Sequence, residues 1–238
     1  MTHRAFAVTV LLVGCGVGAA LAQTPDPRTA PGQLAICGGA ENWRKIGFLD
    51  FEVRITSGET EQGPWVYRWD RNYGFFRITG KGPDGQAIDV ALDLGSRTGG
   101  GWKAGKQLMG QELSTTVSWA LQRFSEDVLW LTFPLEWGAQ GVTVKPRPNV
   151  TDEAGVAHPA VQVESRLGKW ETWLDPATGR VARTIFDRTG GGRFTATWAD
   201  WTPSAGVFFA HKLVIAETGE VVTVKVARAL ETAPRDAF

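Results

Sequence analysis

The sequence holds few of the residues from which catalytic and metal centres are most often built. Among 238 residues there are 2 cysteines and 3 histidines. Removal of the N-terminal signal described below leaves only Cys37, His158 and His211. A single cysteine forms no intrachain disulfide and cannot supply the ligands of a zinc site. We therefore interpret Cys37 as a small buried or half-buried side chain and predict no metal site.

An excess of charge of one sign is also missing. Lysine and arginine together number 25, aspartate and glutamate together number 25, and the formal net charge is +0. Proteins that bind nucleic acids usually carry a basic surface, so we predict no nucleic-acid partner. Residues 100–107 resemble a phosphate-binding loop, but Gln107 stands where a serine or threonine would hold Mg²⁺. We accordingly predict no cofactor.

Long hydrophobic runs are missing after the first 22 residues. Arg4 followed by the apolar stretch Ala5–Ala20 is typical of an export signal, and this stretch is short for a membrane span, which needs about 20 residues. Cleavage after Ala22 would release a soluble protein, whereas cleavage before Cys15 would leave a lipid-anchored one. The polar, proline-rich stretch from Gln23 favours release. We predict a soluble periplasmic protein without a transmembrane span after cleavage.

Acidic residues and histidines give no positive case for catalysis. The pairs Glu126–Asp127 and Asp152–Glu153 are adjacent in sequence, so their side chains point in different directions and make poor acid–base partners. His158 precedes a proline, and His211 alternates with apolar residues, which is typical of structural histidines. We predict that the protein is not an enzyme.

Strand patterns account for most of the chain. In the first of them, Phe51, Val53 and Ile55 alternate with charged residues, a period of two. Similar segments follow to the C-terminus, separated by glycine, aspartate and asparagine turns. These connections are too short for parallel crossovers, so the strands are predicted to pair antiparallel, on the order of ten in one sheet.

One segment has a helical period. Between about Glu112 and Asp127, apolar residues recur at intervals of three and four: Leu113, Val117, Leu121, Phe124 and Val128. The predicted fold class is α+β, a large and strongly curved antiparallel sheet, an open half-barrel, with one inserted amphipathic lid helix on its concave face. We predict a signal peptide at 1–22, a flexible linker at 23–38 and a single domain at 39–238.

The 11 tryptophans are open to three interpretations. Trp65 and Trp69 share one strand face with Tyr67, and exposed aromatic platforms of this kind bind sugar rings. Inward tryptophans would instead line an apolar cavity. In the third interpretation they only cover the helix and the sheet edges. One helix cannot cover so wide a sheet, and a void lined by apolar side chains favours an apolar ligand.

Three stretches resemble a known family: "WLTFPLEWGAQGVTVK", "WETWLDPATGRVARTIF" and "FTATWADWTPSAGVFFAHKLVI". Together with the helix they are similar to the LolA-like group of periplasmic lipoprotein carriers and uncharacterised relatives. The resemblance spans roughly residues 39–230 and rests on strands and turns. It implies a half-barrel closed by a helical lid, with acyl chains between sheet and lid.

The predicted function is to bind a lipid, an acyl chain or another apolar ligand in this cavity, in lipid or lipoprotein transport across the periplasm. Its partners would be the acylated ligand and transport proteins of the envelope, and the protein itself a monomer. The alternatives are an exported enzyme that uses the same cavity and a tryptophan-based carbohydrate-binding module. The side chains predicted to line the cavity are Val117, Leu121, Phe124, Phe209, Leu213, Val222, Val224 and Val226.

Overall fold

The computed structural model describes residues 25–189 and 192–238. The predicted signal peptide at 1–22, both cleavage sites and Cys15 lie outside these residues. None of the helices in the described part combines the length and the apolar character that a membrane span requires.

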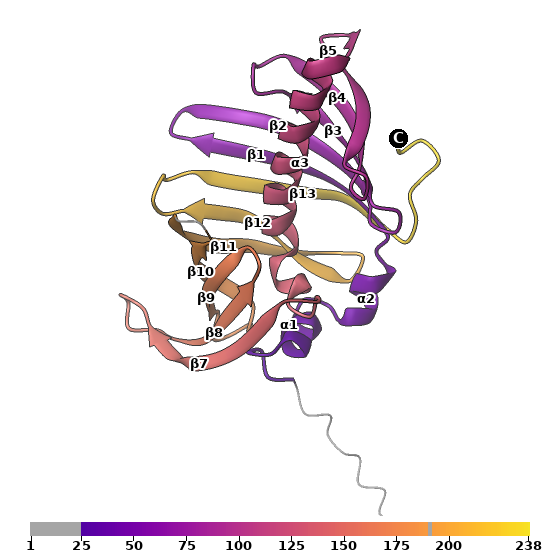
Figure 1. Ribbon diagram of the computed structural model, residues 1–238. Coiled ribbons are helices and arrows are strands. Elements are labelled where there is room, and N and C mark those ends of the chain that lie inside the picture. Colours follow the sequence, from indigo (N-terminus) through magenta and orange to yellow (C-terminus); the bar gives the residue numbers. More distant parts are fainter. Residues whose placement is uncertain (1–24, 190–191) are drawn as a thin grey trace, which may run out of the picture.

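A single antiparallel sheet dominates the fold (Figure 1). Its thirteen strands in the described residues run in the order β6-β5-β4-β3-β2-β1-β13-β12-β11-β10-β9-β8-β7. The predicted α+β fold class, a curved open sheet with one lid helix, is confirmed, with more strands than predicted. The strands are β1 (Phe48–Ser57), β2 (Thr60–Asp70), β3 (Phe75–Lys81), β4 (Ala87–Asp93), β5 (Thr98–Lys103), β6 (Lys106–Gln107), β7 (Thr143–Thr151), β8 (Ala157–Ser165), β9 (Gly168–Leu174), β10 (Val181–Arg188), β11 (Arg193–Ser204), β12 (Val207–Ile215) and β13 (Val221–Leu230).

The chain builds this sheet outward and then inward. It starts at β1 in the middle and adds β2 to β6 as hairpins toward one edge. After crossing to β7 at the opposite edge, it returns through hairpins to β13, which pairs with β1. Val53 pairs with Val224 and Ile55 with Val222, and partners across a strand pair lie on the same face. The apolar rows predicted by the period of two therefore lie side by side.

The crossing between the two edges is made by helix α3 (Gly110–Thr132), which ends in a 3₁₀ turn, η1 (Phe133–Glu136). The helix lies across one face of the sheet, from the β5 end toward β7 (Figure 1). It is longer at both ends than the predicted span of residues 112–127. Apolar residues continue at helical spacing to Leu131, and the α-helix then ends before Pro134, which has no amide N–H to donate to a carbonyl of the preceding turn.

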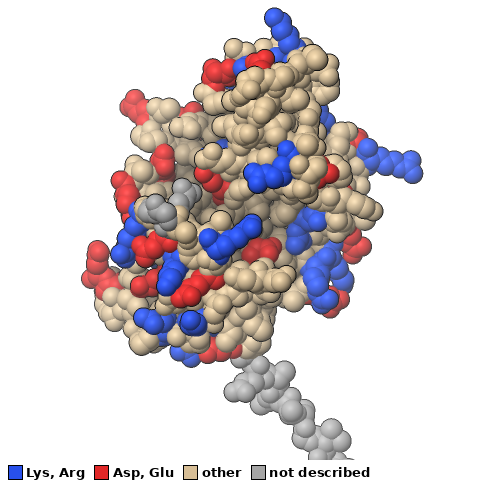
Figure 2. Space-filling view, viewed as in Figure 1, with Lys and Arg blue, Asp and Glu red and all other residues tan. Residues whose placement is uncertain are grey.

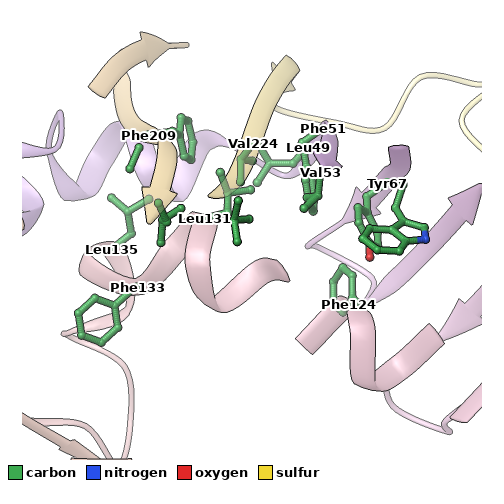
Figure 3. Packing of buried hydrophobic residues seen from close by; sticks show 14 of the residues in the cluster. Leu49, Phe51, Val53, Tyr67, Phe124, Leu131, Phe133, Leu135, Phe209 and Val224 are labelled. Carbon is green, nitrogen blue, oxygen red and sulfur yellow. The ribbon is translucent and has the colours of Figure 1, made fainter. Parts of the chain in front are cut away.

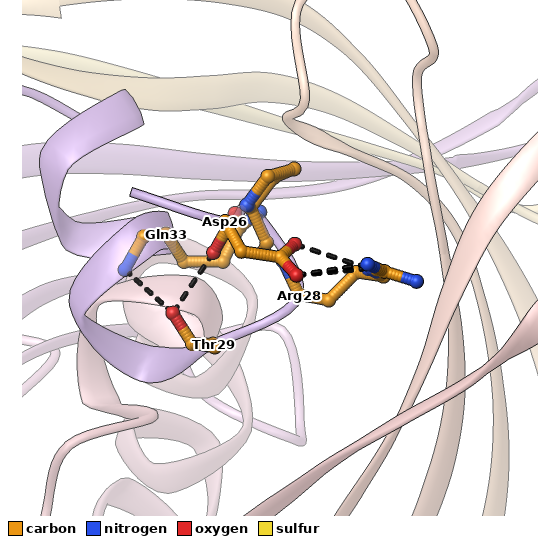
Figure 4. Close-up of polar contacts among 6 residues, drawn as sticks. Asp26, Arg28, Thr29 and Gln33 are labelled. Atoms are coloured by element: carbon orange, nitrogen blue, oxygen red, sulfur yellow. Dashed lines mark hydrogen bonds and ion pairs between the residues drawn. The ribbon is translucent and has the colours of Figure 1, made fainter. Parts of the chain in front are cut away.

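The segment predicted as a flexible linker at 23–38 instead contains helix α1 (Ala30–Ile36), followed by α2 (Ala40–Lys45). Thr29 caps α1 by accepting a hydrogen bond of 3.1 Å from the amide of Gly32. Asp26 faces Arg28 beside this cap (Figure 4). Gln33 is fully buried and donates to the carbonyl of Gly179, at 2.7 Å. These contacts fix the segment, although its proline-rich composition resembles a linker.

Gln33 of α1 donates its hydrogen bond to the turn at residues 175–179. This turn shows how the hairpins are closed. Asp175 accepts hydrogen bonds from the amides of Ala177 and Thr178, at 3.1 and 2.7 Å. Gly179 has a φ of 72°, a left-handed conformation that glycine adopts without a steric cost. The D-P-x-T-G stretch on which the family resemblance partly rests is thus a hydrogen-bonded β9–β10 turn.

Candidate functional site

The middle of α3 is packed tightly against the sheet. Phe124 is 4% exposed and stacks on Phe76, with ring centroids 4.1 Å apart. Its ring also meets that of Tyr67, at 5.9 Å (Figure 3), and that of Trp69, at 5.3 Å. No room for a ligand is left at this point of the helix–sheet interface, because aromatic rings fill it.

A buried ionic cluster fixes the same part of the helix. Asp127 is fully buried, accepts a hydrogen bond of 2.6 Å from the Tyr67 hydroxyl and forms a salt bridge with Arg123. Burial raises the pKa of Asp127, and the charge of Arg123 opposes this effect. Burial and the nearby carboxylate raise the pKa of Tyr67 well above its ordinary value, so the phenol stays protonated and donates. Asp127 is thus an anchor between α3 and β2, rather than a solvated surface residue.

The eight side chains predicted to line the cavity all belong to the core or pack against it. Val117, Phe124, Phe209, Leu213, Val222 and Val224 are buried, while Leu121 and Val226 are half-buried. In the core, Leu131 and Leu135 lie on the same side as Phe209 and Val224 (Figure 3). None of the eight borders the surface pockets described next. Their role in ligand binding stays a prediction.

Pockets lie along both halves of α3, and those along its C-terminal half adjoin one another. A pocket of about 380 Å³ is enclosed by the end of the helix, η1, the loop after it and the β8–β9 hairpin. Its lining is mainly apolar, and we call it the first arm. The lining residues that carry its character are Val128, Phe133, Trp137, Val142, Val163 and Trp170.

Two more pockets adjoin the first arm. One of about 440 Å³ lies between α3 and the β8–β9 turn; it is bordered by Gln122, Glu126, Arg166 and Thr189, and we call it the mouth. Another of about 350 Å³, the second arm, reaches the β12–β13 turn and is bordered chiefly by Trp130, Phe186, Phe194, Ile215 and Thr218. Leu129 borders all three, so they form one continuous groove.

Aromatic rings form the floor of this groove. Trp170 stacks on Phe186 at 4.3 Å, and Trp130 meets Phe194 edge-on at 5.3 Å. Such contacts hold the rings in place without filling the space above them. The indole nitrogen of Trp137 is buried and has no hydrogen-bond partner among the described residues.

The groove residues on the helix were missed by the sequence reasoning because the helix was predicted to end at Asp127. The signal was present in "VLWLTFPLEW", where the apolar spacing continues past that residue. This stretch includes Leu129, Trp130, Phe133 and Trp137, four of the residues that border the groove.

The tryptophans proposed as an exposed sugar platform lie beneath the helix. Trp65 is 6% exposed, and Trp69 is half-buried against the core. Trp119 of α3 packs on Trp65 with ring centroids 6.4 Å apart. Neither indole therefore forms an exposed platform, although Trp65 borders a pocket of about 450 Å³ beside Trp119.

Charge on the face that carries α3 is mixed. Acidic and basic side chains are interspersed there without a large area of one sign (Figure 2). This agrees with the balanced composition and offers no broad basic surface for a polyanion on that face.

The remaining reactive groups have structural partners. His158 bonds through Nε2 to Asp152 and through Nδ1 to the carbonyl of Leu174, both at 3.0 Å. Burial lowers the pKa of His211 and raises the pKa of the Cys37 thiol to about 12, so Cys37 is a poor nucleophile. Within residues 25–189 and 192–238, no three His, Cys, Asp or Glu side chains gather as a metal site.

We expect the β7–β8 hairpin to lose stability as the pH rises through the pKa of His158. The hydrogen bond to Asp152 raises this pKa above 6.5 and lowers that of Asp152. The stabilising form is the protonated imidazole, which is fully present below the unfolded-state pKa and lost above the folded-state pKa. Amide-exchange protection factors of residues 152–158, measured between about pH 5 and 8, test this.

The variant His158→Asn should make those protection factors independent of pH, and His211→Asn, as a control, should not. A pH profile that His158→Asn leaves unchanged would show that another group controls the hairpin.

Among known proteins, the chain has matches in solved structures. No protein-family model and no curated protein matches the chain. Among solved structures, it is similar to a LolA superfamily protein from Nitrosomonas europaea, with 13% identity, a TM-score of 0.46, and coverage of 87% of this chain and 96% of that one. It is also similar to a DUF1329 family protein from Desulfovibrio piger, with 7% identity, a TM-score of 0.41, and coverage of 86% of this chain and 94% of that one. For the lipoprotein LppX of Mycobacterium tuberculosis, the identity is 8% and the TM-score 0.34, with coverage of 89% of this chain and 100% of that one. One of these structural neighbours carries the name of the LolA superfamily.

Proposed function

We propose that the protein is an exported, non-catalytic carrier that binds the acyl chain of a lipid, or another apolar ligand, in the groove along the C-terminal half of α3. The observation that carries this proposal is the groove itself, which is continuous, mainly apolar and open beside α3. The expected setting is the periplasm, where a monomer released after Ala22 would exchange its ligand with envelope partners.

The size and lining of the groove fit such a ligand. Each of its three pockets measures about 350–440 Å³, within the ~300–1,000 Å³ usual for small-molecule sites. Valine, leucine, phenylalanine and tryptophan border it, and burying their apolar surface together with that of a ligand contributes ~25 cal/mol per Å². Polar side chains gather at the mouth, where they can orient a head group.

The delipidated protein is expected to bind saturated fatty acids with an affinity that rises with chain length. Each additional buried CH₂ contributes ~0.8 kcal/mol, or about fourfold in Kd, until the groove is full. Titration calorimetry over a series of chain lengths, with tryptophan emission as a second signal, measures this. Emission should change because Trp130, Trp137 and Trp170 border the groove.

Leu129→Asn and Leu113→Asn provide a matched pair for this titration. Both leucines are half-buried on α3, but Leu129 borders the whole groove and Leu113 none of it. We expect Leu129→Asn to weaken binding about tenfold, by placing an amide among apolar contacts, and Leu113→Asn to change it less than twofold. Binding that is unsaturable or independent of chain length would refute the proposal.

A further inference from the structure

A further pocket lies where α3 meets the ends of the β1–β2 and β3–β4 hairpins. It measures about 450 Å³, within the ~300–1,000 Å³ usual for small-molecule sites. It shares no bordering residue with the three pockets of the groove. We call it the hairpin pocket, and the side chains that give it its character are Glu61, Gln62, Trp65, Lys81, Trp119 and Arg123.

The lining of the hairpin pocket differs in kind from that of the groove. Among the described residues that border it there is no valine, leucine, isoleucine or phenylalanine. Its large apolar side chains are the indoles of Trp65 and Trp119. Polar and apolar atoms line it about equally, whereas the groove is mainly apolar. An acyl chain would bind poorly here, because its methylene groups would cover polar groups without offering them hydrogen bonds.

Most of the charge at this pocket is already paired within the protein. Glu61 accepts a hydrogen bond of 2.8 Å from Arg54, and Arg123 forms a salt bridge with Asp127. Lys81 is exposed, so water screens its charge. An anionic ligand would therefore gain little attraction, and the pocket is better suited to a neutral polar ligand.

The planar side chains of the pocket are held in fixed positions. Trp65 donates from Nε1 to the carbonyl of Lys81 at 2.8 Å, and its ring lies 6.4 Å from that of Trp119, at an angle of 60°. The Arg123 guanidinium lies over the Trp65 ring, 5.1 Å from its centroid. Trp65 is 6% exposed and Trp119 is half-buried, so Trp119 offers the more open indole. A site held in this way loses little conformational freedom when a ligand binds.

From this arrangement we propose that the hairpin pocket binds a neutral saccharide, with one sugar ring against Trp119 and its hydroxyls bonded to Glu61, Gln62 and Lys81. A sugar ring matches the lining because its C–H face is apolar and its rim carries hydroxyls that donate and accept. The carboxylate accepts, the ammonium donates and the amide does both. The inference goes beyond the proposed function and does not rest on it.

Titration calorimetry and saturation-transfer NMR with maltotriose, cellotriose and triacetylchitotriose test the proposal. We expect at least one of these neutral trisaccharides to bind saturably, as one molecule per protein, with transfer strongest to the C–H protons of one ring. Trp119→Leu should weaken that binding about tenfold. Trp130→Leu is the matched control, because Trp130 is half-buried on the same helix but borders the groove instead, and it should change the Kd less than twofold.

Gln62→Ala is a second variant, which keeps the test decisive if Trp119→Leu does not fold, because Gln62 is exposed. It removes a hydrogen-bonding amide and should weaken the same trisaccharide about fivefold. Gln86→Ala is its control, since Gln86 is exposed in the β3–β4 turn and does not border the pocket. This control should leave the Kd unchanged.

Absence of saturable binding of all three trisaccharides would overturn the proposal. Binding that Trp119→Leu and Gln62→Ala both leave unchanged would do the same, because the sugar would then occupy another surface. Inorganic phosphate is the probe for an anion site: saturable phosphate binding that Lys81→Met abolishes, without any trisaccharide bound, would replace the saccharide by an anion. The fatty-acid titration decides the groove separately, since the two sites share no bordering residue.

Discussion

Replacing Asp127 with alanine is expected to lower the free energy of unfolding by about 3–5 kcal/mol, because it leaves a buried charge without its partner. Asp127 is fully buried and lies between the Tyr67 hydroxyl and Arg123. Only 15% of the Arg123 side chain is exposed, so water and the longer contact with Glu126, at 3.5 Å, replace little of the interaction with the lost carboxylate. Urea denaturation followed by circular dichroism measures the change.

Tyr67→Phe is the matched control for this prediction. It removes one hydrogen bond and leaves the Asp127–Arg123 pair in place, so we expect a smaller loss of about 1–3 kcal/mol. Equal losses in the two variants would mean that the phenol, rather than the ion pair, holds α3 on the sheet. A loss below ~1 kcal/mol for Asp127→Ala would mean that the cluster is solvated in solution.

Truncating Phe124 to alanine is the second change with a large expected effect, about 3–5 kcal/mol of unfolding free energy. Its ring is enclosed by those of Phe76, Tyr67 and Trp69, so its removal opens a cavity that the rigid sheet cannot close. The thermal midpoint and the urea midpoint should both fall. Fluorescence of Trp69 should report the change locally, since its ring meets that of Phe124 at 5.3 Å.

Leu121→Ala serves as the comparison on the same helix. Leu121 is half-buried, so the expected loss is about 1–2 kcal/mol, in proportion to the smaller apolar area that it buries. If both variants cost the same, Phe124 would not be the main contact between α3 and β2–β3.

The fold class could be predicted because each element has its own periodic signal. Phe51, Val53 and Ile55 alternate as a strand does, and Val117, Leu121 and Phe124 recur as on a helix. The short connections then required antiparallel neighbours. These signals are local, so they can be found in the sequence without knowledge of the rest of the chain.

The position of the groove could not be predicted in the same way. Two kinds of apolar strand residue look alike in sequence. Some, such as Val222 and Val224, belong to inward rows, and others, such as Val163, border the groove. Which rows the helix covers depends on its path across the sheet, and that path is fixed by non-local contacts such as Tyr67 with Asp127. Strands β5 and β6 were also missed, because the glycines of β5 and the two residues of β6 carry no period.

The pairing of β1 with β13 has a consequence for how the protein folds. Phe48 pairs with Leu230, so residues from nearly opposite ends of the described chain meet in the middle of the sheet, not at its edge. Contacts this distant in sequence carry a large loop-closure entropy and slow folding. If the chain is exported N-terminus first, as proposed, it cannot join its two half-sheets until the final strand has emerged. Until then the inner edges of both halves would present unpaired backbone, a surface prone to aggregation.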